Sequence, residues 1–148
     1  MHEDLKLQIL EKYNVYKNAI LEEVEEYAYR NNRYNVNFTI ALFISDKKLD
    51  LNLASKTIRD TDKAIVLEDN FLATVFDFSD SKSGFKAAEN LLSKLEPQVF
   101  GGKIFVSIVS SEDSIDDDEQ IRKALNILID EISKKLDGIP ISEENHII

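Results

Sequence analysis

The chain of 148 residues contains no cysteine and only two histidines, His2 and His146. The absence of cysteine excludes a disulfide framework, a zinc cluster held by thiolates and a thiol nucleophile, and it fits a reducing compartment. The two histidines stand near opposite ends of the sequence, where we expect surface residues in mobile termini. A histidine-centred active site is therefore disfavoured.

Long apolar segments are also missing. No stretch approaches the roughly 18 apolar residues that a membrane-spanning helix requires. The charged residues from Glu3 and Asp4 onward do not form the apolar core of a signal peptide. The longest apolar run, residues 40–44, has the length of a strand. We therefore expect a cytoplasmic protein that does not bind a membrane.

Positive charge is scarce, because 18 Lys and Arg residues face 28 Asp and Glu residues, giving a formal net charge of −10. Such a surface repels phosphate backbones, which disfavours nucleic acids as partners. A local basic site can still take a small phosphorylated ligand. The hydrophobic content of 43% is enough for one continuous core.

The periodicity of apolar residues predicts one α+β domain over residues 1–148. Helices are expected at 4–12, 16–30, 51–58, 81–95 and 121–136, with an interruption at Tyr13-Asn14 and the last helix ending at Gly138. Strands are expected at 38–44, 64–67, 71–78 and 103–109, with a tight hairpin between the second and third and a short edge strand in the tail 139–148. This order predicts a four- to five-stranded, mostly antiparallel sheet packed with helices. Residues 1–12 are a candidate N-terminal signalling helix.

One segment carries a recognisable spacing. Arg59 and Asp62 form an R-x-x-D element, and after five further residues the chain reads Glu68-Asp69-Asn70-Phe71-Leu72. This arrangement resembles the signature hairpin of the bacterial GGDEF family of diguanylate cyclases, in which R-x-x-D precedes the G-G-D/E-E-F turn by the same interval. The resemblance implies a ferredoxin-like, nucleotidyl-cyclase-like fold and a place in cyclic di-GMP signal transduction.

Flanking segments agree with this resemblance, which covers residues 13–138. Tyr13-Asn14 falls where the family has a leucine/tyrosine-asparagine-arginine element, although Val15 replaces the arginine. Residues 103–109 resemble the family's strand before its last helix. The segment 45–58 is shorter than the helical excursion that contacts the guanine base in active members.

The resemblance also implies that the motif is degenerate. The family's two turn glycines let the backbone approach a nucleoside triphosphate, and here Glu68 and Asp69 stand in their place. The next two family residues are acids that help to hold a divalent metal. Asn70 is a weaker, neutral ligand, and Phe71 cannot bind metal. We therefore do not expect diguanylate cyclase activity, a resident metal or another cofactor.

A further family metal ligand is the first acid of a D-x-D-like pair at the end of the first strand. The alignment places Ile44 at this position and Asp46 at the second acid. Asp46, Glu68 and Asp69 are weak candidates for a rearranged metal site, in which case the chain is a nucleotide-processing enzyme. Acids in a hairpin turn are more commonly solvated turn residues.

Two other functions stay open. The family's R-x-x-D element can bind cyclic di-GMP, so Arg59 and Asp62 are candidate ligand-binding residues of a receptor domain. The pair can equally be a surface ion pair near a helix end, worth ~0–1 kcal/mol. Alternatively, the chain keeps only the cyclase scaffold and acts through another protein or through self-association.

Overall fold

A computed structural model describes residues 2–142 of the chain. The helices are α1 (His2–Glu11), α2 (Tyr13–Tyr34), α3 (Leu51–Thr57), α4 (Ser81–Leu95) and α5 (Asp117–Lys134), with short 3₁₀ turns at Glu96–Gln98 and Ser111–Asp113. The strands are β1 (Thr39–Ser45), β2 (Lys63–Glu68), β3 (Phe71–Phe76), β4 (Ile104–Ser110) and β5 (Pro140–Ser142). None of the described helices is both long enough and apolar enough to span a membrane.

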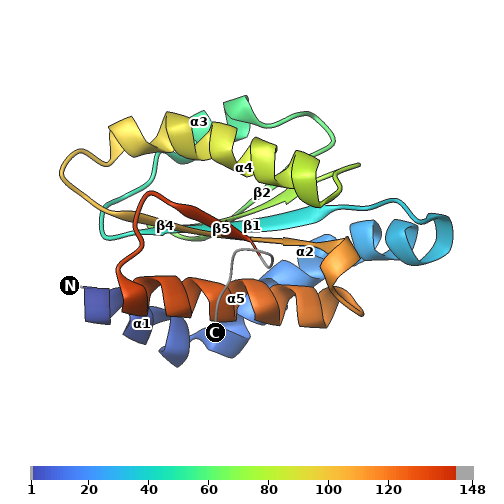
Figure 1. The fold of residues 1–148 in the computed structure, drawn as a ribbon, viewed down its shortest axis with the longest axis horizontal. Coiled ribbons are helices and arrows are strands. Elements are labelled where there is room, and N and C mark those ends of the chain that lie inside the picture. The colour runs from blue at the N-terminus through green and yellow to red at the C-terminus, as the bar shows by residue number, and fades with distance from the viewer. Residues whose placement is uncertain (1, 143–148) are drawn as a thin grey trace.

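The strands form one sheet in the order β2-β3-β1-β4-β5. The first four are antiparallel to their neighbours, and β5 pairs in parallel with β4. Figure 1 shows α3 and α4 on one face of the sheet and α1, α2 and α5 on the other. This arrangement confirms the predicted α+β fold with a four- to five-stranded, mostly antiparallel sheet, and the number of strands is five.

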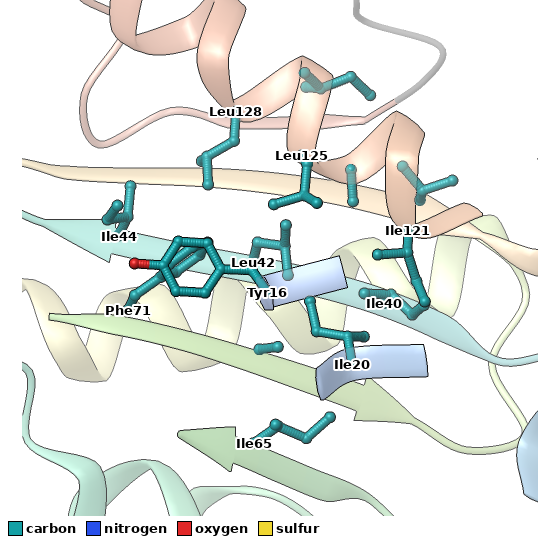
Figure 2. Close-up of a cluster of buried hydrophobic side chains, with 14 of the residues drawn as sticks. Tyr16, Ile20, Ile40, Leu42, Ile44, Ile65, Phe71, Ile121, Leu125 and Leu128 are labelled. Atoms are coloured by element: carbon teal, nitrogen blue, oxygen red, sulfur yellow. The ribbon is translucent and has the colours of Figure 1, made fainter. Parts of the chain in front are cut away.

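The core lies on both faces of β1, because every residue of this central strand is buried. Ile40, Leu42 and Ile44 belong to the cluster beneath α2 and α5 (Figure 2). Ala41 and Phe43 belong to the cluster on the α3 and α4 side. Side chains that alternate between two apolar layers explain why the sequence of this strand reads as an unbroken apolar run.

Aspartates begin three of the helices. The carboxylates of Asp50, Asp80 and Asp116 accept hydrogen bonds from backbone N–H groups in the first turns of α3, α4 and α5 at 2.8–3.0 Å. These bonds satisfy donors that have no partner inside the helix. The caps therefore fix where each of these helices starts.

The predicted end of the last helix at Gly138 is wrong. Helix α5 ends at Lys134, and Lys135 adopts a left-handed conformation with φ of 59°. The Leu136 N–H then bonds to the Glu131 carbonyl at 3.0 Å, which closes the helix four residues early. Gly138, with φ of 72°, instead turns the chain into β5.

Two other predictions need adjustment. The break between the first helices falls at Lys12 and not at Tyr13-Asn14, because Tyr13 already belongs to α2. The predicted edge strand in the tail is β5, which covers residues 140–142. Residues 143–148, with His146, lie outside the described part of the chain.

Helix α5 carries a buried acid against the sheet. Glu131 is only 1% exposed, and its Oε1 accepts a hydrogen bond from the Val106 N–H of β4 at 3.3 Å. Its Oε2 has no partner among the described residues. Burial raises the pKa of the Glu131 carboxyl to about 10, so the folded protein holds this side chain in its neutral form at pH 7.

Glu131→Gln should change how stability depends on pH. The folded pKa lies above the ordinary value of 4.5, so the unfolded chain loses the proton first. The contribution of this group to stability is fully present below pH 4.5 and is lost as pH rises toward 10. The variant should therefore gain stability relative to the wild type as pH increases, by about 1.4 kcal/mol per pH unit and roughly 3 kcal/mol at pH 7.

Urea unfolding at pH 5, 6, 7 and 8 measures this difference. Asp130→Asn, which alters the neighbouring and partly exposed acid, is the matched control and should run parallel to the wild type. If the free energies of unfolding of Glu131→Gln and of the wild type changed with pH in parallel, Glu131 would not be a buried neutral acid.

Candidate functional site

The hairpin between β2 and β3 turns at Asp69 and Asn70. The Asn70 amide Nδ2 donates to the Ser45 carbonyl at 2.9 Å and to Gln8 Oε1 at 3.0 Å. Gln8 Nε2 donates back to Asn70 Oδ1 at 3.1 Å. The side chain that stands at the family's first acidic turn position therefore joins the turn to the end of β1 and to helix α1.

Glu68, at the end of β2, is also engaged by the first two helices. Its Oε2 accepts hydrogen bonds from Lys12 Nζ at 2.8 Å and from the Tyr16 hydroxyl at 3.0 Å. These two bonds hold the pKa of the Glu68 carboxyl below its ordinary value. The carboxylate is thus ionised and paired within the protein at neutral pH.

An apolar pair occupies the positions where the family resemblance expects metal ligands. Ile44 and Phe71 are register partners on β1 and β3, and both are fully buried. The Tyr16 ring packs edge-on against Phe71 with 4.8 Å between ring centroids. Figure 2 shows the three side chains together in the core. Leu72 points to the opposite face and is buried there.

The three weak metal candidates do not come together as a site. Asp46 Oδ1 accepts a hydrogen bond from the Lys103 N–H at 2.7 Å. Asp69 has a side chain that is 76% exposed and lies 3.8 Å from Lys48 Nζ. Within residues 2–142, no group of three or more acidic or histidine side chains is arranged to hold a metal ion.

The structure does bring Arg59 and Asp62 together, as an ion pair just before the start of β2. The Asp62 carboxylate accepts bonds from the Arg59 backbone N–H, Nε and Nη2 at 2.9–3.1 Å. It also accepts the Asp77 N–H at 2.8 Å. An ionised carboxylate offers about four acceptor positions, so these bonds saturate Asp62, which is only 3% exposed.

The arginine retains binding capacity that the aspartate has lost. Arg59 Nη2 also donates to the Asp77 carbonyl, but the side chain is 57% exposed and its Nη1 bonds to no described residue. A surface hollow of about 200 Å³ lies beside it, with Asn90 and Phe76 in its lining. This volume is below the roughly 300–1,000 Å³ of pockets that enclose whole drug-sized ligands.

Three side chains that contact the hairpin are not predictable from the sequence. Gln8 and Lys12 fall in the helix expected at 4–12, and Tyr16 begins the helix expected at 16–30. Tyr16 is indeed buried, but its hydroxyl also reaches Glu68. No local pattern links these residues to a turn more than fifty positions later, so only the tertiary fold reveals the contact.

No protein-family model matches the chain, and no curated protein sequence matches it. Solved structures do. The GGDEF domain of PA1120 (YfiN or TpbB) from Pseudomonas aeruginosa aligns with a TM-score of 0.67 over 88% of this chain and 96% of that chain, at 11% identity. The chain has the GGDEF-domain fold.

Two further GGDEF structures show how far this likeness extends. The GGDEF domain of DgcB from Caulobacter crescentus, solved in complex with c-di-GMP, aligns with a TM-score of 0.66 over 86% of this chain and 90% of that one, at 7% identity. The diguanylate cyclase SiaD of Pseudomonas aeruginosa, solved with its activator SiaC, aligns with a TM-score of 0.64 over 95% and 68%, at 8% identity. These structural alignments establish the GGDEF fold. Because the sequence identities are so low, function must be argued from the site itself.

Proposed function

We propose that this chain is a catalytically inactive GGDEF-fold domain that regulates by contact with another protein or with a second copy of itself. The observation that carries this proposal is the apolar pair Ile44 and Phe71, buried where a cyclase needs metal-binding carboxylates. The degenerate hairpin turn supports it.

The apolar pair leaves no place for the metal. Magnesium requires near-octahedral oxygen ligands at about 2.0–2.1 Å, and Ile44 and Phe71 supply none. Burying each of these side chains contributes roughly 1.5–3 kcal/mol to folding. The residues that remove the metal site thus stabilise the domain, which explains how the fold persists without catalysis.

The turn is equally unsuited to a triphosphate. Glu68 and Asp69 place two carboxyl side chains where the family uses bare backbone, and these side chains occupy the space that a triphosphate needs. Glu68 is ionised and held by Lys12 and Tyr16, so it does not swing clear without losing both bonds. Asn70 is likewise held by Ser45 and Gln8.

Regulation by contact is supported by a structural neighbour and by the surface. SiaD, which shares the fold, was solved with a protein activator. In this chain Leu7, Leu10 and Val15 are between 49% and 64% exposed on the first two helices. These side chains give an interface apolar area without requiring any intact pocket.

The purified protein should form no cyclic di-GMP from GTP with either Mg²⁺ or Mn²⁺, whereas an active diguanylate cyclase assayed in parallel forms it. Phe71→Glu should also be inactive, because one carboxylate does not rebuild the ligand set. This variant should lose about 3 kcal/mol or more of stability, since it buries an unpaired charge in place of an aromatic side chain. Chromatographic product analysis and urea unfolding check the two expectations.

Metal-dependent turnover of GTP or ATP by the wild type would contradict an inactive domain. If Glu68→Ala or Asp69→Ala abolished that turnover, the chain would be a nucleotide-processing enzyme with a rearranged metal site.

A receptor for cyclic di-GMP is the second candidate function, and the exposed Arg59 guanidinium favours it. The exposed Arg59 side chain lines the 200 Å³ hollow, which is suited to part of a dinucleotide and not to its whole. Arginine can bond a phosphate or stack on a base. Asp62 contributes by fixing the arginine, because its own acceptor positions are already used.

For the receptor, a millimolar excess of cyclic di-GMP should raise the melting temperature by mass action. Arg59→Ala should abolish the rise. Arg122→Ala is the matched control, because Arg122 also pairs with an aspartate but sits on α5, and it should retain the rise. A melting temperature that cyclic di-GMP leaves unchanged in the wild type would eliminate the receptor and leave the contact-based function.

A further inference from the structure

Helix α1 meets α2 at a single non-helical residue. This residue is Lys12, which lies between Glu11 and Tyr13 and has φ of −114° and ψ of 21°. Backbone hydrogen bonds continue across it, from the Lys12 N–H to the Gln8 carbonyl at 3.3 Å and from the Tyr16 N–H to the Lys12 carbonyl at 2.9 Å. The direction of α1 relative to α2 therefore depends on the torsion angles of one residue.

Helix α1 packs against α5 with one narrow apolar edge. Leu5 and Ile9, one helical turn apart, are the buried side chains of this edge. Leu7 and Leu10 on the other side are about half exposed. A ten-residue helix is not stable alone in water, so α1 keeps its helical form because it is docked.

Polar contacts from Gln8 of α1 and from Lys12 reach the hairpin. Gln8 makes the reciprocal amide pair with Asn70, and Lys12 makes the 2.8 Å ion pair with Glu68. The ion pair is accessible to water, with side chains 53% and 34% exposed. Water and salt can therefore replace it at low cost.

We propose that α1 is a releasable latch on the hairpin, which swings open at Lys12 while the sheet and the other helices stay folded. In the closed state, Gln8 and Lys12 cover Asn70 and Glu68. Opening uncovers this amide and this carboxylate together with the apolar seat of Leu5 and Ile9 on α5.

The side chains of α1 in the closed state indicate which partner could bind the surface that α1 uncovers when it opens. Helix α1 presents apolar side chains at Leu5 and Ile9 and an amide at Gln8, and the residue that follows the helix, Lys12, adds a cation. An amphipathic helix of a partner with the same pattern matches the uncovered surface in shape and charge. This goes beyond the proposed function, because it names the segment that moves and the contact that controls it.

The lack of cysteine makes the latch directly measurable. Spin labels on Leu7→Cys and Asp69→Cys, both exposed positions, report the distance between α1 and the hairpin by double electron–electron resonance. Adding Lys12→Glu places two carboxylates against one another and should increase the open population at least tenfold. Near-ultraviolet circular dichroism should stay that of the folded domain.

Two further variants separate the latch from general destabilisation. Lys12→Glu combined with Glu68→Lys restores an opposite-charge pair and should return the distance to its closed value. Lys17→Glu breaks the equivalent ion pair of α2 with Asp118 at 3.2 Å and should leave the distance unchanged.

The proposal is overturned if Lys12→Glu leaves the distance distribution closed, or if α1 separates only when the whole domain unfolds. The readout is a distance and not an activity. Turnover of GTP by the wild type would remove the proposed function and leave this test standing.

Discussion

The packing of Ile44 against Phe71, with the Tyr16 ring edge-on to the phenylalanine, is the contact on which the rest of the site depends. It joins β1, β3 and α2 in one buried layer (Figure 2). These two strand positions lie beside the hairpin turn. Because both side chains are fully buried, this end of the sheet is packed with hydrocarbon.

The polar contacts around this layer follow from the same arrangement. Tyr16 must be buried to cover Phe71, and its hydroxyl then needs a partner, which Glu68 supplies. Lys12 lies one turn before Tyr16 and neutralises the same carboxylate. The carboxylate of Glu68 is thus held by the helix that completes the core, so the polar contacts of the turn and the packing of Phe71 depend on the same tyrosine.

The sequence predicted the element order and the fold because apolar periodicity reports burial directly. It placed the hairpin correctly because the polar residues Glu68, Asp69 and Asn70 separate two apolar, strand-like segments. It misplaced the end of α5, because a left-handed lysine cannot be recognised from the sequence. Gly138 was the residue type expected at a helix C-terminus. The contacts of Gln8 and Lys12 with the hairpin were not predictable, because they join residues that only the tertiary fold brings together. The burial of Glu131 was likewise not predicted, because α5 carries four other acids that are only partly buried.

The central claim is that the protein's own side chains fill the hairpin end of the sheet and exclude a metal-bound nucleotide. Two-dimensional ¹H–¹⁵N NMR of the uniformly labelled protein, titrated with Mg²⁺ and a non-hydrolysable GTP analogue to millimolar concentration, tests it directly. The account predicts that the backbone signals of residues 68–71 and the Asn70 side-chain amide keep their positions. Saturable, magnesium-dependent shifts confined to these signals would contradict it.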